Sequence, residues 1–81
     1  MEKITENKLI LHGFNVKKTH GHSFTTSYYE KDGFKIIHMN AGEQFENWVY
    51  TIVKDNKTFF IKTMKQVEEE YLLVSGKNLK Y

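Results

Sequence analysis

The sequence contains no cysteine, no proline and no long hydrophobic run. The lack of cysteine excludes disulfide bonds, thiolate nucleophiles and cysteine-ligated zinc sites. Because secreted domains of this size usually depend on disulfides, their absence favours the reducing cytoplasm. A membrane-spanning helix requires about 20 apolar residues, and the charged segment 1–8 lacks the apolar stretch of a signal peptide. We therefore expect a cytoplasmic protein that does not bind membranes.

Charge of one sign is also scarce. Lys and Arg together number 12 and Asp and Glu number 10, which gives a net charge of +2. A nucleic-acid-binding domain is usually much more basic than this. Glycine-rich phosphate loops, nucleophile elbows and paired-carboxylate motifs are missing as well. The sequence therefore predicts a protein that is not an enzyme and that uses no cofactor.

Aromatic residues, in contrast, are abundant, with six Phe, five Tyr and one Trp among 81 residues. A chain this short forms one domain, residues 1–81, and buries only about 60–65% of the surface that its unfolded form exposes. Such a core has no volume to spare for a deep pocket. Large rings fill a small core efficiently, and the remaining rings mark a binding face. We therefore expect the protein to act through an outer surface.

A β-hairpin is the clearest local signal. Asp32-Gly33 lies between two β-prone runs, 23–31 and 34–39, and this dipeptide favours a two-residue turn because both positions need a positive φ. The resulting register pairs Glu30 with Lys35, Tyr29 with Ile36, and Tyr28 with Ile37. The charges of the first pair are complementary, which supports the register.

A second hairpin is predicted from 45–53, a turn at Asp55-Asn56, and 58–62. Alternation along its two strands places five large side chains on one core face: Trp48, Tyr50, Ile52, Phe59 and Ile61. Val49 and Phe60 then lie on the opposite face, where we expect the N-terminal helix to cover them. A further strand, 14–19, is predicted before the first hairpin.

A helix is predicted near each end of the sequence. Thr5 can cap a short helix over 5–12, and Gly13 suits its left-handed C-terminal cap. Thr63 and Gln66 have the spacing of a capping box that opens the last helix, which Gly76 ends. The buried stripe of that helix is predicted to contain Met64, Val67, Tyr71 and Val74, widened by Leu72 or Leu73. The fold class is thus α+β, with an antiparallel sheet of four to five strands packed by a C-terminal helix and a short N-terminal helix.

Four residues are candidates for binding: Tyr28, Lys35, Glu68 and Glu69. Tyr28 and Tyr29 must face opposite ways on a strand, so one ring is left on the outer side of the sheet. Tyr28 shares its face with Lys35, and the N-terminal helix could cover this face. If it does not, the face is an apolar patch with a charged rim, which is typical of a protein interface. The same mixture of rings and lysines could stack single-stranded bases. Glu68 and Glu69 begin the polar side of the last helix, as a solvated face or as an acidic patch for a basic partner.

The histidines suggest two further hypotheses. His20 and His22 would share one face of a strand, but the sequence supplies no third and fourth ligand for a metal ion, so we expect polar turn residues and no metal site. The segment His20-Gly21-His22-Ser23-Phe24, which follows a short helix ending in Gly13-Phe14, resembles HicA-type messenger-RNA interferase toxins. That resemblance implies a general acid or base role for His22, although the glycine here separates the two histidines.

The C-terminal third resembles a set of small proteins from phages and mobile elements of Bacteroidetes. Their last helix reads roughly Gln-Leu-x-x-Leu-Tyr-x-x-Leu-Thr-Gly-x-x-Leu. The matching residues here are Ile61-Lys62-Thr63, Gln66 to Tyr71, Val74-Ser75-Gly76 and Leu79, and Leu11 to Phe14 resembles the family's N-terminal helix end. Val67, Glu70 and Ser75 depart from the pattern. The shared residues cap and pack a helix, and they include no catalytic residue.

This resemblance implies a phage protein that binds and inhibits a host defence system in the cytoplasm of an infected bacterium. The leading hypothesis is an anti-CRISPR protein whose partner is a CRISPR effector ribonucleoprotein of the RNA-targeting Cas13 type. The alternatives are a single-stranded nucleic-acid-binding domain and a HicA-like RNase that uses His22.

Overall fold

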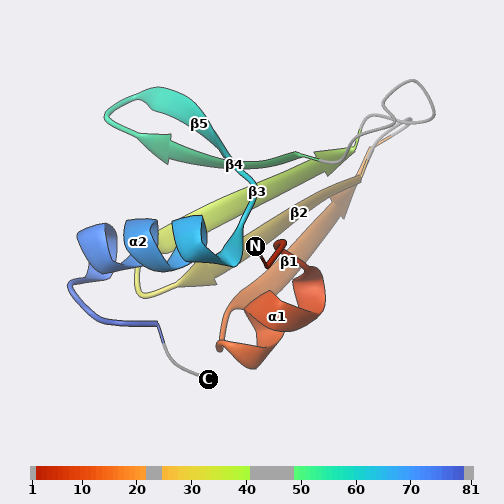
Figure 1. Ribbon diagram of the computed structural model, residues 1–81. Coiled ribbons are helices and arrows are strands. Elements are labelled where there is room, and N and C mark those ends of the chain that lie inside the picture. Colours follow the sequence, from red (N-terminus) through yellow and green to blue (C-terminus); the bar gives the residue numbers. More distant parts are fainter. Residues whose placement is uncertain (1, 22–24, 41–48, 80–81) are drawn as a thin grey trace.

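The computed structural model describes residues 2–21, 25–40 and 49–79, with the backbone alone at Asn40 and Val49 (Figure 1). Its elements are, in order, α1 (Glu6–Leu11), β1 (Asn15–His20), β2 (Thr25–Lys31), β3 (Phe34–Asn40), β4 (Val49–Lys54), β5 (Lys57–Ile61) and α2 (Met64–Ser75). The predicted α+β class is confirmed, with five strands and a helix near each end.

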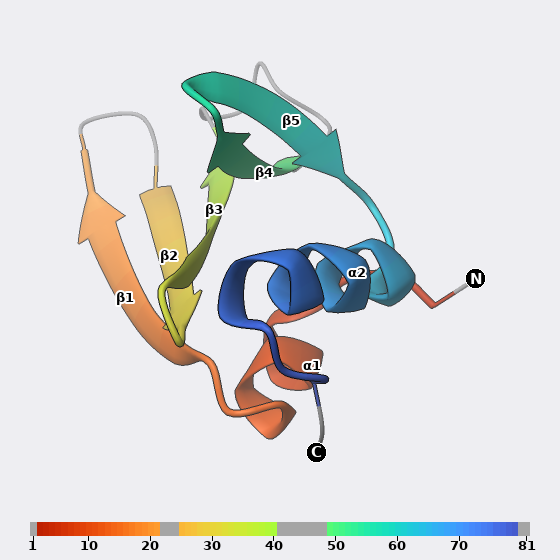
Figure 2. The same cartoon turned by 90° about the vertical axis from the view of Figure 1, so that its left-hand side faces the viewer.

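The five strands form one antiparallel sheet in the order β1-β2-β3-β4-β5, so each strand pairs with its neighbour in the sequence. The sheet is strongly twisted, and the β4–β5 hairpin curls over the helices (Figure 2). Both helices lie on the same side of the sheet (Figures 1 and 2). We call this the helix side and the opposite surface the open face, because no helix of the described chain covers it.

Both predicted hairpin turns are confirmed. Asp32 and Gly33 have φ angles of 50° and 82°, and Asp55 and Asn56 have φ angles of 52° and 62°. Two successive positive φ values are typical of a type I′ turn, whose twist matches that of the flanking strands. The register of the first hairpin is also as predicted, since Tyr29 pairs with Ile36. Local turn chemistry therefore sets which side chains share a face.

The core lies between the sheet and the two helices. Its buried members are Ile4, Leu9, Phe14, Tyr29, Phe34, Ile36, Ile52, Ile61, Met64, Val67 and Tyr71. Tyr71 of α2 lies at the centre, with its ring centroid 6.2 Å from that of Phe14 and 6.1 Å from that of Phe34. Such tilted and edge-on ring contacts stabilise beyond simple area burial.

Helix α1 is closed at both ends by local hydrogen bonds. The Thr5 hydroxyl accepts from the Lys8 amide at 3.2 Å. At the other end the Phe14 amide donates to the Leu9 carbonyl at 3.0 Å, across Gly13 with its φ of 92°. This is the Schellman pattern, and it brings Phe14 back onto the helix and into the core.

The predicted stripe of α2 is correct for its first part and wrong for its last. Met64, Val67 and Tyr71 are buried, whereas Val74 is 53% exposed and Leu72 and Leu73 are 44% and 67% exposed. The cause is the sheet beneath. Among the described residues the pairing of β3 with β4 begins at Ile37–Thr51, so the strands have parted where the last turn of α2 passes.

The predicted core face of the second hairpin is also only partly correct. Tyr50 packs against the core and Ile52 and Ile61 are buried, but Phe59 is 44% exposed because β5 is the edge strand. The expectation that a helix covers Phe60 is wrong, since this residue is 66% exposed and α1 packs on the other side of the sheet (Figure 2). Trp48 and the side chain of Val49 lie outside what the structure describes.

The predicted capping box of α2 is present in full. The Thr63 hydroxyl accepts from the Gln66 amide at 3.3 Å, while the Gln66 side-chain oxygen accepts from the Thr63 amide at 3.2 Å. We predict that Thr63→Ala lowers the free energy of unfolding by about 1 kcal/mol, the usual cost of losing such a cap. Urea denaturation measures the change. Lys65→Ala, an exposed change in the same helix, should stay within about 0.5 kcal/mol of the parent, and an equal loss in both variants would contradict the prediction.

A second prediction concerns Asp32, which accepts a hydrogen bond from the Tyr71 hydroxyl and lies 3.7 Å from the Lys77 ammonium. The hydrogen bond from Tyr71, with smaller help from the Lys77 charge, lowers the pKa of Asp32. Asp32 therefore stabilises the fold above the unfolded-state pKa of about 3.9, and this contribution disappears as the pH falls through the lower folded-state pKa.

Asp32→Asn tests this contribution, because asparagine suits the same turn but carries no charge. We expect the variant to be less stable than the parent at neutral pH, and the two to converge below about pH 4. Urea midpoints measured across the pH range give the comparison. A difference that is the same at pH 3 and pH 7 would show that the carboxylate is not responsible.

Candidate functional site: the open face of the sheet

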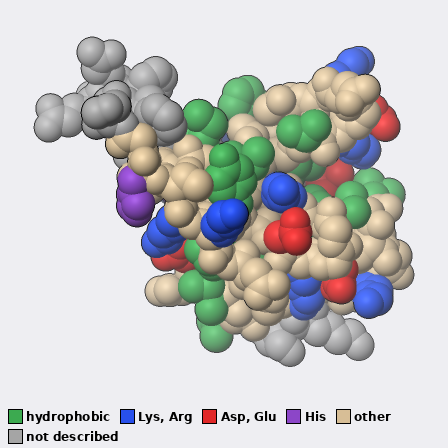
Figure 3. Space-filling model, turned by 180° about the vertical axis from the view of Figure 1, so that it is seen from behind, with side chains coloured by type: hydrophobic (Ala, Val, Ile, Leu, Met, Phe, Trp, Pro, Cys, Tyr) green, Lys and Arg blue, Asp and Glu red, His purple; other side chains and the backbone are tan. Residues whose placement is uncertain are grey.

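The open face carries a row of side chains that crosses all five strands. The pairings place Lys17 beside Tyr28, Tyr28 beside Ile37, Ile37 beside Thr51, and Thr51 beside Phe60. Met39 lies on the same face, two residues from Ile37 along β3. Seen from this side, hydrophobic side chains gather near the middle of the sheet with lysines next to them (Figure 3).

Exposure makes this row a surface and not a second core. Phe60 is 66% exposed and Met39 is 44% exposed, while Tyr28 and Ile37 are half-buried by their neighbours. We call Tyr28, Ile37, Met39 and Phe60 the apolar stripe. Contiguous apolar side chains with a polar rim are typical of an interaction site on a small protein.

The predicted candidates Tyr28 and Lys35 both lie on the open face. Lys35 is exposed, and its ammonium lies 3.8 Å from the carboxylate of Glu30, its predicted cross-strand partner. The other two candidates, Glu68 and Glu69, are exposed on α2, on the helix side of the sheet. The structure therefore separates the four residues into two pairs on opposite sides of the molecule.

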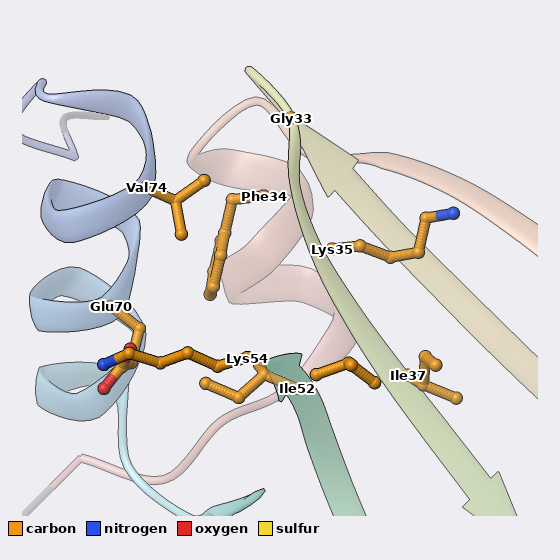
Figure 4. Close-up of a pocket in the computed structure, with 9 residues that line it drawn as sticks. Gly33, Phe34, Lys35, Ile37, Ile52, Lys54, Glu70 and Val74 are labelled. Carbon is orange, nitrogen blue, oxygen red and sulfur yellow. The ribbon is translucent and has the colours of Figure 1, made fainter. Parts of the chain in front are cut away.

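A cleft of about 190 Å³ opens where β3 and β4 part (Figure 4). We call it the fork. Lys35, Ile37 and Val53 line it from the open face. On the helix side, an ion pair of 3.4 Å joins Lys54 to Glu70 at its border. The sequence does not predict the fork, because neither the residues of β3 nor those of β4 indicate how many of them pair with the other strand.

A polar cluster ties α1 to the helix side of the sheet. The Glu6 carboxylate lies 3.1 Å from the Lys18 ammonium, and it accepts a hydrogen bond of 3.1 Å from the Tyr29 hydroxyl. Nearby, His38 stacks on Tyr50 with ring centroids 3.9 Å apart and planes within 4°. Four strands thus contribute to the cluster, which fixes the position of α1.

Burial governs the protonation of this cluster. It raises the pKa of Tyr29 to about 12 and also raises the pKa of Tyr50, while it lowers the pKa of His38. The hydrogen bond from Lys18 is the main reason that the pKa of Glu6 is lowered. At neutral pH the cluster therefore holds neutral phenols and a neutral imidazole around one carboxylate–ammonium pair.

His38 gives a third prediction. Because its folded-state pKa is below the unfolded value of about 6.5, the unfolded chain takes up the proton first, and stability falls as the pH drops from about 6.5 through the folded-state pKa. His38→Phe keeps a ring against Tyr50 and removes this proton uptake. We expect its thermal midpoint to change less than the parent's between pH 7 and pH 5. An equal change in both proteins would show that His38 does not control the acid response.

Of the two histidines in the segment 20–24, the structure describes only His20. The His20 ring nitrogen Nδ1 lies 3.3 Å from the Thr25 hydroxyl oxygen, beside the end of β1. His22 lies outside the described residues, so its proposed role as a general acid or base stays a prediction. Within residues 2–21, 25–40 and 49–79, His, Asp and Glu form no group of three or more that could hold a metal ion.

In the described chain no helix is both long and apolar enough to cross a membrane. No family model matches the sequence, no curated protein is a match, and no solved structure matches the fold. The class of protein is therefore defined by its architecture, an α+β domain with one helix-covered and one open sheet face.

Proposed function

We propose that this chain is a protein-binding domain that docks a partner protein on its open face, and that it inhibits a host defence system in this way. The single observation that carries the proposal is the apolar stripe on the side of the sheet opposite both helices. Leaving these side chains in water gains nothing for folding, whereas burying them against a partner would stabilise a complex.

The charges around the stripe favour a protein over a nucleic acid. Lys35 is already paired with Glu30, and two of the stripe's four members, Ile37 and Met39, are aliphatic. Binding to phosphates needs several cations that have no carboxylate beside them. Apolar interface centres with charged residues at the rim are typical of protein complexes.

Inhibition of a host nuclease, with an RNA-targeting CRISPR effector of the Cas13 type as the target, rests on the resemblance of the C-terminal helix to small phage proteins. The fold adds a physical reason. A small domain with an apolar stripe on β2, β3 and β5 can block a binding channel without any chemistry of its own. Its function would then depend on shape and surface alone.

A single-stranded nucleic acid is the second candidate, because Lys17 lies directly beside Tyr28 in the register. A ring next to an ammonium can stack a base and contact its phosphate. This alternative predicts binding that weakens steeply with salt, and Lys17→Ala would reduce the salt slope by about one.

The fourth prediction tests the open face directly. Tyr28→Ala and Phe60→Ala should each weaken the complex at least about tenfold, because truncating an aromatic hot-spot side chain costs about 2 kcal/mol or more. Leu73→Ala is the matched control, since Leu73 is 67% exposed against 66% for Phe60 but belongs to α2. The partner is first isolated by affinity purification from a bacterium that carries an RNA-targeting CRISPR effector, and affinity is then measured calorimetrically.

Two outcomes would contradict the proposal. If Leu73→Ala or charge reversal at Glu68 and Glu69 abolished binding while Phe60→Ala did not, the helix side would be the interface. If RNA co-purified and no protein did, the nucleic-acid alternative would replace it. The inhibitory role is tested separately, by asking whether the chain restores phage plating on cells defended by the effector and whether Phe60→Ala fails to do so.

A further inference from the structure

The outer edge of β5 has no neighbouring strand among the described residues. The two-residue turn makes Lys54–Lys57 the closing hydrogen-bonded pair of the hairpin, so the backbone groups of Lys57, Phe59 and Ile61 point toward β4. Those of Thr58 and Phe60 must then point away from the sheet. Within the described chain, β5 pairs with β4 alone and ends the sheet.

The chain itself uses only the neighbouring part of this edge. Residues 2–4 run antiparallel to residues 62–64, where the Ile4 amide donates to the Lys62 carbonyl at 3.3 Å and the Met64 amide donates to the Glu2 carbonyl at 2.9 Å. This contact stops short of Phe60. Thr58 and Phe60 would together offer an added strand about four backbone hydrogen bonds, two at each residue.

The two edges of the sheet differ in their side chains. The β1 edge carries Lys17 and Lys18, and charged side chains of this kind discourage edge-to-edge pairing. The β5 edge reads Lys57-Thr58-Phe59-Phe60-Ile61 and has one charge and three large apolar residues. Phe59 and Phe60 are 44% and 66% exposed. An exposed apolar edge is typical of a strand that pairs with another chain.

We propose that two copies of this chain pair through β5 in an antiparallel arrangement about a two-fold axis at Phe59. In this register Thr58 of each copy lies opposite Phe60 of the other, and the outward backbone groups of both residues meet their partners. The two Phe59 rings face each other across the axis, at a pair without hydrogen bonds, where side chains approach most closely. The two five-stranded sheets become one continuous sheet.

Charge complementarity favours a second copy of this chain as the partner of the β5 edge. The register places Lys57 of one copy opposite Ile61 of the other, on the helix side of the sheet. There Ile61 borders a cleft of about 230 Å³ whose lining includes Gln66 and Glu69 of α2. The ammonium of Lys57 can thus approach the Glu69 carboxylate across the interface, twice by symmetry. The two Lys57 side chains themselves lie four positions apart, so like charges do not meet.

The fifth prediction is therefore a concentration-dependent dimer, measured by sedimentation velocity over a dilution series. Phe59→Asp should raise the dissociation constant at least about tenfold, because it places two carboxylates at the axis. Leu73→Asp introduces the same charge at an exposed site on α2 and should dimerise like the parent. Glu69→Lys should weaken the dimer, and the double variant Lys57→Glu with Glu69→Lys should restore it.

Amide hydrogen exchange on the unmodified chain gives an independent readout. The amides of Thr58 and Phe60 should exchange more slowly as the protein concentration rises, since only dimer formation gives them backbone acceptors. A chain that stays monomeric up to its solubility limit would overturn the proposal. So would a dimer that Phe59→Asp leaves intact, or one in which these two amides exchange at the same rate at every concentration.

Discussion

Tyr71 provides the contact on which the rest of the fold depends. Its ring packs on Phe14, at the end of α1, and on Phe34, at the start of β3. Its hydroxyl donates to Asp32 in the first hairpin turn, and the Lys31 ammonium lies 5.6 Å from its ring centroid. One side chain thus joins both helices to the best-defined hairpin, and this fixes the side of the sheet that the helices cover.

The small amount of helix in the described residues then leaves one side of the sheet without a cover. α1 has six residues and α2 has twelve, which is enough to cover one side of a five-stranded sheet but not both. A sheet normally buries at least one face, and here no helix of the described chain covers the second face. The same shortage explains the exposed β5, because no element of the described chain is left to cover that edge.

Local chemistry made much of the fold predictable. Asp32-Gly33 and Asp55-Asn56 specify two-residue turns, and these turns fix the register of two hairpins without any knowledge of the tertiary structure. Thr63 with Gln66 sets the start of α2 in the same way. That Tyr28 and Lys35 share one face of the sheet followed from alternation alone. These are features in which neighbouring residues carry the whole signal.

The errors arose where distant segments decide the outcome. Val74 has the helical spacing of a core residue, but its burial depended on β3 and β4 remaining paired beneath it. Phe60 is exposed because α1 packs beside α2, and the sequence of α1 does not indicate which side of the sheet it joins. Of the four predicted binding residues, Tyr28 and Lys35 share the open face. Glu68 and Glu69 lie on the helix side, because the sequence of a helix does not indicate on which side of the sheet it packs.

The limited pairing of β3 with β4 has a mechanical consequence. Beyond residues 37–39 and 49–51 the second hairpin is attached to α2 by the Lys54–Glu70 ion pair and by the packing of Ile52 and Ile61. Local opening of the turn end of this hairpin therefore costs less free energy than global unfolding. The angle between strands β1 to β3 and the β4–β5 hairpin can thus change at a low free-energy cost. A curved binding partner would favour one value of this angle.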